Sequence, residues 1–327
     1  MAITDCNIND CAGKKLAVIA IGGNSLIKRR DRQSVEDQYH AMCETMVHVA
    51  EIIESGWQVV LTHGNGPQVG FIMLRSEIAR AATGLHIVPL DNCVADTQGS
   101  IGYQVLQALG NELRTRGLPA PLAALVTQTK VDRSDPALCS PDKFVGEFYA
   151  KEQLAELTKL HPDWILKEDS GRGWRRVVPS PKPLEIVELQ AIKTLLDQGF
   201  HVAAVGGGGI PVVESPEGLL GVDAVIDKDL ASSLLAKNLG AKVLIISTAV
   251  DRVSINYGTP NQVDLGSISL AEAEAYYAQG HFPPGNMGPK INAAIEFLRQ
   301  GGNKVIITSP ENMREAMLGK QGTLICR

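Results

Sequence analysis

Three aliphatic runs that end directly in glycine-rich turns are the feature that most constrains the fold of this chain. Leu16 to Ile21 leads into Gly22-Gly23, Val59 to Thr62 leads into HGNGP, and His201 to Val205 leads into GGGGIP. Such a run is typical of a strand covered on both faces. Glycines at its end let a ligand approach the backbone, and the amides of a following helix bind anions. A tight turn without a ligand is the alternative for any one loop, but the repetition favours a binding site.

The segments between these loops alternate between strand and helix patterns. We expect a capping box at Ser34 and Asp37, a helix cap at Asp91, and an edge strand at the C-terminus. Strands are expected at 16–21, 57–62, 122–127, 201–205, 242–247, 304–308 and 324–326. Helices are expected at 34–54, 68–82, 91–116, 184–198, 226–239, 270–279 and 290–300. This alternation predicts an α/β fold, with helices on both faces of a mostly parallel sheet and ligands at the carboxyl ends of its strands.

Two segments depart from the alternation. Residues 1–14 are polar and are expected to form a flexible N-terminal extension. Residues 130–183 break the pattern and carry many of the prolines and charges, together with Trp164 and Trp174. Because this stretch is too long for a plain loop in a compact domain, we interpret it as a small inserted subdomain that acts as a lid.

Charge and composition exclude several classes of partner. The formal net charge of −5 gives no general attraction to nucleic acid or to an anionic membrane. No apolar run approaches the roughly 20 residues that a membrane span requires. The six cysteines form no C-x-x-C pair, and we expect them to be reduced thiols of a cytoplasmic protein.

The common catalytic signatures are missing, so the candidate chemistry rests on the glycine loops and the lysines. The sequence has no P-loop, no dinucleotide fingerprint after the first strand, no G-x-S-x-G, no H-E-x-x-H and no H-R-D loop. Lys228 lies between Asp227 and Asp229, which is expected of a lysine oriented by carboxylates, although an exposed helix start is the alternative. Lys290 follows Gly-Pro at a helix start, where it can face an anion, or simply lie in a surface turn.

Two further residues have an open interpretation at this point. Lys143 lies in the expected lid and, on spacing alone, reads as a solvated lysine. His63 precedes a glycine loop, where shaping the loop by hydrogen bonding is favoured over acid–base work. Lysines and phosphate-type loops without a nucleophile or a metal cluster favour phosphoryl transfer, in which a protein mainly positions groups and neutralises charge.

Taken together, the motifs resemble those of the carbamate kinases, a branch of the amino acid kinase family. The resemblance runs in order from about Lys15 to the C-terminus. It is carried by GGNSL (22–26), HGNGPQVG (63–70), CVADTQGSIGY (93–103), VTQ (126–128), DP (135–136), EDSGRGWRRVVPSPKP (168–183), GGGGIPVV (206–213), AVIDKDLAS (224–232), INYG (255–258), GHFPPGNMGPK (280–290) and IITS (306–309).

This resemblance implies a three-layer αβα sandwich, usually a homodimer, with a protruding subdomain near 131–178. It implies reversible transfer of the γ-phosphoryl group of ATP to carbamate, which gives ADP and carbamoyl phosphate. Residues 15–200 would bind carbamate or carbamoyl phosphate, and residues 201–327 would bind the nucleotide. The implied cofactor is Mg²⁺, held mainly by the nucleotide phosphates rather than by a protein metal site.

The resemblance also implies roles for individual residues. Lys228 and Lys290 match phosphate-stabilising lysines, Asp229 matches the aspartate that orients them, and Lys143 matches the subdomain lysine that reaches the transferring phosphoryl group. The carbamate side would lie on Gly22, Gly23, Asn24, Gly64, Asn65, Gly66, Gly207 and Gly208. The nucleotide would lie near Thr248, Asp251, Tyr257 and Met287.

Three positions depart from the family pattern. Ser25 stands where alanine is common, Asn286 where serine is common, and Phe144 where proline is common after the subdomain lysine. A kinase for another small acid and a non-catalytic, ATP-binding regulatory protein therefore stay open as alternatives. A nicotinamide-binding enzyme rests only on the glycine content. Carbamoyl phosphate is common to arginine and allantoin catabolism, so the sequence does not distinguish these pathways.

Overall fold

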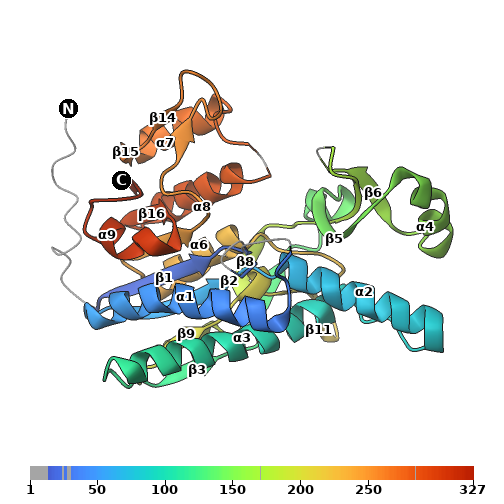
Figure 1. Cartoon of the computed structure of the whole chain (residues 1–327), viewed down its shortest axis with the longest axis horizontal. Helices are drawn as coiled ribbons and strands as arrows, with labels where there is room; N and C mark the ends of the chain where they lie inside the picture. Colours follow the sequence, from blue (N-terminus) through green and yellow to red (C-terminus); the bar gives the residue numbers. More distant parts are fainter. Residues whose placement is uncertain (1–13, 24–25, 28–30, 170, 284) are drawn as a thin grey trace.

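The centre of the computed structural model is an eight-stranded sheet with the order β15-β17-β16-β12-β1-β2-β9-β3 (Figure 1). The structure describes residues 14–23, 26–27, 31–169, 171–283 and 285–327. Only β16 and β17 pair in an antiparallel sense, so the mostly parallel sheet is confirmed. The strands are β1 (Leu16–Ile21), β2 (Gln58–His63), β3 (Leu122–Ala124), β9 (His201–Ala203), β12 (Val243–Ser247), β15 (Ser267–Ser269), β16 (Lys304–Thr308) and β17 (Thr323–Cys326).

The three strands that precede the glycine loops are neighbours in this sheet. β1 pairs with β2, and β2 pairs with β9, all in parallel register. Ile21, the last residue of β1, lies opposite His63 of β2 and Ser247 of β12. Because the carboxyl ends of parallel strands share one edge, the three loops meet there, as the sequence predicted.

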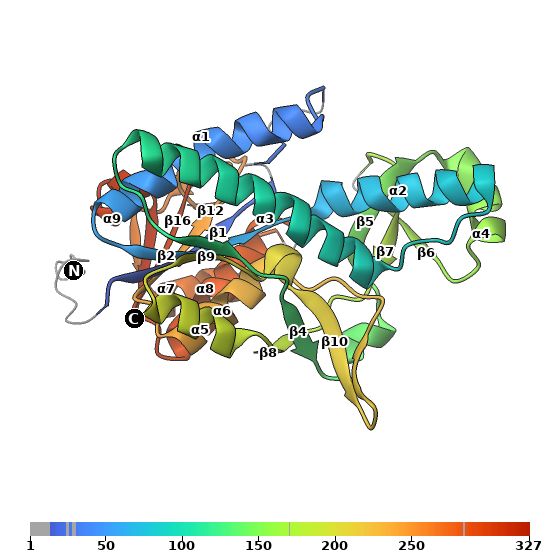
Figure 2. The same ribbon diagram turned by 90° about the horizontal axis from the view of Figure 1, so that it is seen from below.

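Helices cover both faces of the sheet, which confirms the αβα sandwich (Figure 2). Ala17, Ile19 and Ile21 of β1 pack toward one face, and Leu16 and Val18 pack toward the other. The first face is covered by α1 (Val35–Glu54), α3 (Leu90–Thr115) and α9 (Met313–Met317). The second is covered by α5 (Leu189–Asp197), α6 (Lys228–Leu239), α7 (Leu270–Ala278) and α8 (Met287–Arg299). Burial of the strands on both faces explains their continuous aliphatic runs.

The helix starts follow their capping residues. The capping box at α1 is confirmed, since the Asp37 amide donates to Ser34 Oγ at 3.1 Å and the Ser34 amide donates to Asp37 Oδ2 at 3.2 Å. The cap predicted at Asp91 is wrong, because α3 begins after Pro89. The Asp91 carboxylate instead accepts a hydrogen bond from the neighbouring Asn92 amide at 2.8 Å.

A second sheet accounts for several errors of the sequence prediction. It has the order β11-β10-β4-β8, formed by β4 (Gln128–Val131), β8 (Pro183–Ile186), β10 (Ile210–Ser215) and β11 (Gly218–Gly221). The helix expected at 184–198 is wrong in its first turn, because residues 183–186 form β8 and pair with β4, and α5 starts only at Leu189. The strand predicted at 122–127 ends at Ala124, since the chain crosses there toward β4. The hairpin of β10 and β11 was not predicted.

The 131–178 segment has a small sheet of its own. Its three strands have the order β5-β7-β6 and are all antiparallel: β5 (Lys143–Tyr149), β6 (Ile165–Glu168) and β7 (Trp174–Val178). The short helix α4 (Leu154–Leu160) and the 3-10 turns Pro136–Cys139 and Lys151–Gln153 complete it. This unit, here called the insertion, projects beside α2 (Gly66–Thr83), as both views show (Figures 1 and 2).

Two remaining expectations are corrected by the structure. The C-terminal strand β17 lies between β15 and β16, so it is not an edge strand. Cys43, Cys93 and Cys139 are free thiols, as expected, but Cys326 is disulfide-bonded, so the expectation of reduced thiols throughout is wrong. Among the described residues, no helix is long and apolar enough to cross a membrane. Residues 1–13 of the extension predicted at 1–14, and the positions Asn24 and Ser25, lie outside the described residues.

Candidate active site

A cavity of about 220 Å³ opens at the carboxyl edge of the sheet. Its walls come from the loop after β2, the insertion, the glycine loop after β9, the start of α6 and the start of α8. The lining residues are Gly64, Asn65, Gly66, Val69, Lys143, Phe144, Val145, Gly207, Val225, Ile226, Asp227, Lys228, Asp229, Gly285, Asn286, Pro289 and Lys290. Of the residues predicted from the sequence, this cavity brings together the three lysines, Asp229 and four of the substrate-binding positions.

The N-termini of three helices face this cavity. Gly66 begins α2, Lys228 begins α6, and Met287 begins α8, and residues of all three first turns line the walls. The capping positions of α2 and α8, Asn65 and Asn286, make no side-chain hydrogen bond to their helices. Free amides and the positive ends of helix dipoles favour an anion at such a place.

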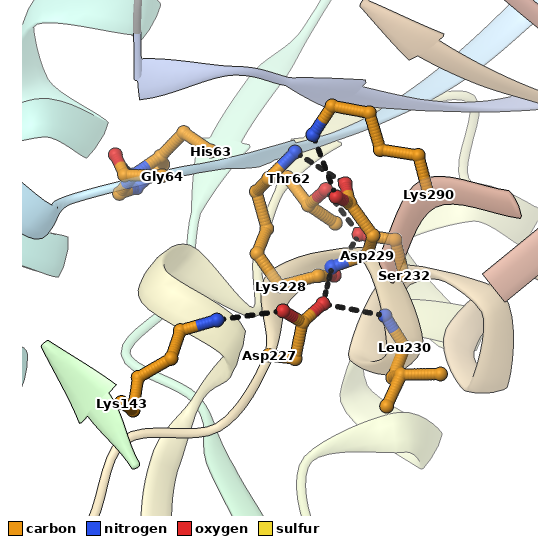
Figure 3. Close-up of polar contacts among 10 residues, drawn as sticks. All are labelled: Thr62, His63, Gly64, Lys143, Asp227, Lys228, Asp229, Leu230, Ser232 and Lys290. Carbon is orange, nitrogen blue, oxygen red and sulfur yellow. Dashed lines mark hydrogen bonds and ion pairs between the residues drawn. The ribbon is translucent and has the colours of Figure 1, made fainter. Parts of the chain in front are cut away.

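The least exposed charged side chain that lines the cavity is a carboxylate between two lysines (Figure 3). Asp229 Oδ2 accepts a hydrogen bond from Lys290 Nζ at 2.9 Å, and Asp229 Oδ1 lies 2.7 Å from Lys228 Nζ. The three side chains are 5 to 13% exposed. Burial alone would raise the pKa of Asp229, but Lys228 and Lys290 outweigh burial and hold that pKa below its usual value.

Lys228 keeps hydrogen-bonding capacity for a ligand. Its ammonium group is buried and pairs with Asp229, but no contact within the described residues has the geometry of a hydrogen bond. Burial, together with the nearby Lys290, lowers the pKa of Lys228. A buried ammonium with unused donors is costly unless an anion satisfies it, and this favours a phosphate or carboxylate ligand in the cavity.

The fourth charged residue of the predicted site enters from the insertion. Lys143, the first residue of β5, donates a hydrogen bond from Nζ to Asp227 Oδ2 at 2.7 Å. Asp227 Oδ1 also accepts hydrogen bonds from the amides of Asp229 and Leu230, so the same carboxylate caps α6 (Figure 3). Lys143 therefore lies at the cavity rather than in solvent, where spacing alone had placed it.

Two buried hydroxyl groups anchor the start of α6 to strand β2 of the central sheet. Ser232 Oγ donates a hydrogen bond to the Lys228 carbonyl at 2.6 Å and lies 2.6 Å from Thr62 Oγ1 on β2. Both hydroxyl side chains are completely buried. This chain of contacts fixes the backbone of Lys228 against the strand whose glycine loop forms the opposite wall.

Gly22 and Gly64, in the first two loops, allow neighbouring backbone segments to approach closely. Their own amides already donate hydrogen bonds within the protein. The Gly22 amide donates to the Ser247 carbonyl at 3.1 Å, and the Gly64 amide donates to the Ile21 carbonyl at 3.0 Å. A Cβ atom on Gly22 would lie 2.8 Å from the Ser247 oxygen, and one on Gly64 would lie 3.2 Å from the Gly23 amide nitrogen. A larger residue would push the loops apart.

The GGGG loop after β9 fits against the loop after β2. Gly207 has a φ of 67°, and a Cβ atom there would overlap the Asn65 side-chain amide. Gly208 packs against the Ile226 carbonyl, and Thr129 Oγ1 donates to the Gly208 carbonyl at 2.9 Å. Only glycine combines this backbone conformation with this approach.

His63 has the structural environment of a loop-shaping residue. Its imidazole is buried, Nδ1 lies 3.1 Å from the Gly64 carbonyl, and a side chain at Gly206 would overlap the ring. Burial, with a contribution from the charge of Lys228, lowers the pKa of His63 to about 4. A neutral imidazole at neutral pH agrees with the preferred interpretation of this residue.

The residues expected near the nucleotide lie outside the lining of this cavity. Thr248 follows β12 and donates its amide to the Thr308 carbonyl at 2.9 Å, and Met287 opens α8. Asp251 Oδ1 accepts hydrogen bonds from Ser309 Oγ and Asn312 Nδ2 at 2.7 and 2.8 Å. Tyr257 is largely exposed between β13 (Ser254–Ile255) and β14 (Val263–Asp264). These four assignments stay predictions.

Two residues that shape the cavity were missed by the sequence interpretation. Asp227 was noted only as a neighbour of Lys228, although an aspartate directly before a predicted helix is a capping signal. Gln98, in the middle of α3, donates from Nε2 to the carbonyls of Thr127 and Gly206 at 3.1 and 2.9 Å. It thereby holds the GGGG loop in place. No sequence signal identifies a buried helical glutamine as a loop clamp.

Comparison with known protein families and their members agrees with this fold and site. The model of the amino acid kinase family matches residues 15–309, so the chain belongs to this family. The carbamate kinase-like protein YahI of Escherichia coli is 50% identical over 96% of this chain and 99% of its own length. The carbamate kinase of Thermococcus kodakarensis is 46% identical over 96% of this chain and 99% of its own length.

Solved structures agree with the sequence relatives. The carbamate kinase of Giardia lamblia bound to AMP-PNP is 44% identical, with a TM-score of 0.89 over 96% of this chain and 99% of that one. The relatives and this structural neighbour identify the chain as a kinase phosphotransferase. The resemblance drawn from the motifs is confirmed at the level of the family.

Proposed function

We propose that the protein is a carbamate kinase that catalyses the reversible reaction of ADP and carbamoyl phosphate to ATP and carbamate. The observation that carries the proposal is the convergence of Lys143, Lys228 and Lys290 with three helix N-termini at one small cavity. The names of the relatives support carbamate as the acceptor. The cavity of about 220 Å³ suits a small, charge-dense substrate better than a large apolar one.

In the direction of ATP formation, a β-phosphate oxygen of ADP attacks the phosphorus atom of carbamoyl phosphate. A new P–O bond forms to ADP, and the P–O bond to carbamate breaks, so that carbamate leaves with the electron pair. No proton transfer is needed, and the protein positions the groups and neutralises the charge of the moving phosphoryl group.

The lysines would divide this work by their place in the fold. Lys228 and Lys290 are fixed on α6 and α8 by Asp229 and would contact phosphoryl oxygens throughout the reaction. Lys143 belongs to the insertion, and we propose that it engages the transferring group when the insertion closes as a lid. Backbone amides at the start of α2, near Gly64, Asn65 and Gly66, would hold carbamate. The nucleotide would lie toward Thr248, Asp251, Tyr257 and Met287.

Mg²⁺ would enter with the nucleotide. Among the described residues there is no group of three or more His, Cys, Asp or Glu side chains that could hold a metal ion. The two carboxylates of the cavity, Asp227 and Asp229, are already paired with lysines. These residues fit a metal carried by the phosphates of ADP or ATP, where it neutralises phosphate charge.

Further parts of the proposal rest on the family resemblance alone. We propose a homodimer located in the cytoplasm, with the carbamate side on residues 15–200 and the nucleotide side on 201–327. This division is functional, since the central sheet contains strands from both parts, and β9 lies between β2 and β3. Which nitrogen pathway supplies the carbamoyl phosphate is set by the organism rather than by this site.

A substrate panel tests the proposal against its rivals. Purified protein is given ADP with carbamoyl phosphate, acetyl phosphate or another small acyl phosphate, and ATP is measured. Fastest turnover of carbamoyl phosphate supports the proposal, whereas a much faster reaction with another donor favours a sister kinase. Calorimetry with ADP covers the remaining alternative, because tight binding without turnover of any donor indicates a regulatory protein.

A further inference from the structure

We infer that Asp227 is a positioning residue of the reaction, which ties Lys143 of the insertion to the N-terminus of α6; this inference rests on the proposed function. The two oxygens of its carboxylate have separate partners (Figure 3). Oδ1 accepts hydrogen bonds from the amides of Asp229 and Leu230, at 2.9 and 3.3 Å. Oδ2 accepts the hydrogen bond from Lys143 Nζ at 2.7 Å. One carboxylate thus joins two elements that carry phosphate-binding lysines.

This ion pair is partly buried, mainly on the side of the carboxylate. The Asp227 side chain is 14% exposed and that of Lys143 is 37% exposed. Within the described part of the chain, Asp227 is the only carboxylate at ion-pair distance from Lys143. A lysine ammonium on a flexible stem is strongly hydrated, so without this partner Lys143 would turn into water. Asp227 therefore keeps the ammonium on the cavity side of the insertion.

The connection also sets where Lys143 lies relative to the other lysines. Asp227 directly precedes Lys228, and its cap fixes the first turn of α6 that holds Lys228 and Asp229. A shift of the insertion therefore moves Lys143 relative to Lys228 and Asp229, which stay in place on α6. The position of Lys143 relative to the other lysines should affect the rate of phosphoryl transfer more than the affinity for the nucleotide, because Lys143 is proposed to act on the transferring group.

A second ion pair, which joins the insertion to the segment just before α6, provides a matched control. Arg176 on β7 lies 2.6 Å from Asp223, only four residues before Asp227. Asp223 is 62% exposed and does not line the cavity. Both pairs tie the insertion to the body, but only that of Asp227 places an ammonium group at the site. Breaking the Asp223 pair therefore measures the effect of a loosened insertion without removing the partner of Lys143.

The test uses Asp227→Asn, which separates the two roles of the carboxylate. Asparagine caps helices as well as aspartate, so Oδ1 keeps its two amide partners, while the amide nitrogen replaces the acceptor for Lys143. We expect kcat to fall about tenfold, with the dissociation constant of ADP within about twofold of the wild-type value. The melting temperature should stay within about 3 °C. Asp223→Asn should change kcat by less than about twofold.

A double-mutant cycle identifies the route of the effect. If Asp227 acts through Lys143, adding Asp227→Asn to Lys143→Ala should cost less than about a further twofold in kcat. A full tenfold loss in that background would overturn the inference, because the carboxylate would then act through Lys228 or the fold. A rise in kcat on Asp227→Asn would also overturn it, since the carboxylate would be withholding Lys143 from the substrate.

A chemical readout keeps this test independent of the proposed function. Acetylation of Lys143 by sulfosuccinimidyl acetate, followed by mass spectrometry, requires the ion pair to break first. We expect Lys143 to be acetylated several-fold faster in Asp227→Asn than in wild type or in Asp223→Asn. Equal rates in all three proteins would contradict the ion pair itself. If the wild-type protein makes no ATP but the rates differ as expected, the proposed function fails and the positioning contact stands.

Discussion

Lys290, on α8, and Asp229, on α6, are 61 positions apart in sequence and meet at 2.9 Å, and this single hydrogen bond joins the starts of the two helices at the cavity. Lys228 approaches the other oxygen of the same carboxylate at 2.7 Å. Two ammonium groups are thereby held next to each other by one anion. With Lys143 and its partner Asp227, the cavity holds three ammonium groups and two carboxylates, so further negative charge, such as that of a phosphoryl group, would balance it.

Asp229→Asn is expected to damage both stability and activity. Without the carboxylate, two buried ammonium groups face each other unpaired, and breaking such a pair costs about 3 to 5 kcal/mol. Urea unfolding should show a loss of that order, and kcat should fall by at least about 100-fold. Asp223→Asn, which breaks an ion pair whose carboxylate is largely exposed, should cost no more than about 1 kcal/mol. Equal effects of the two variants would contradict a special role for Asp229.

Lys143→Ala is expected to slow the reaction without weakening ADP binding. Loss of one charge-assisted contact in a water-poor site costs on the order of 3 kcal/mol, or roughly 100-fold in kcat. Because Lys143 is proposed to act mainly on the closed state, the dissociation constant of ADP should stay within a few-fold. Steady-state kinetics and ADP titration measure both. Loss of ADP binding with unchanged kcat would make Lys143 a nucleotide anchor and would contradict the lid assignment.

Gly207→Ala is expected to distort the cavity wall. The substitution combines a positive φ of 67° with overlap of the Asn65 amide, so it should destabilise the fold by about 2 to 3 kcal/mol and remove most activity. Gly240→Ala is the matched control, since Gly240 has a φ of 64° with open space around its Cβ position. It should cost about 1 kcal/mol and leave kcat unchanged. Similar activity losses would show that backbone strain, not overlap, governs the effect.

His63 is expected to make the fold sensitive to acid. Its folded-state pKa of about 4 is below the ordinary 6.5, so the unfolded chain binds the proton first, and stability falls as pH drops from about 6.5 to about 4. Between pH 7 and pH 5 this amounts to about 2 kcal/mol. Urea unfolding of wild type and His63→Gln at both values measures the difference. An unchanged pH dependence in the variant would show that His63 is not the source.

The sequence predicts the central sheet well because its strands are buried on both faces. Continuous aliphatic runs such as LAVIAI at Leu16–Ile21 and VII at 305–307 are typical of strands covered on both faces. The second sheet was missed, because β8 is short and its residues also fit the first turn of a helix. Pairing with β4, which is distant in sequence, decides its conformation, and local pattern does not contain that information.

The candidate site, like the fold, could be predicted only in part from the sequence. The lysines and glycine loops are visible in the sequence because their residue types and spacing are unusual. Their partners are not: Asp227 reaches Lys143 across 84 positions, and Gln98 reaches the Gly206 carbonyl across 108. Such contacts arise from the way the insertion and α3 pack against the sheet edge. Only the folded chain reveals them.

The most direct test of the central claim is ATP formation from ADP and carbamoyl phosphate by the purified protein, followed by luciferase luminescence with Mg²⁺ present. Lys290→Ala, checked for folding by circular dichroism, sets the background. We predict ATP formation by the wild-type protein at least about 100-fold above this variant. No ATP above the Lys290→Ala background from folded wild-type protein would contradict the assignment as a carbamate kinase.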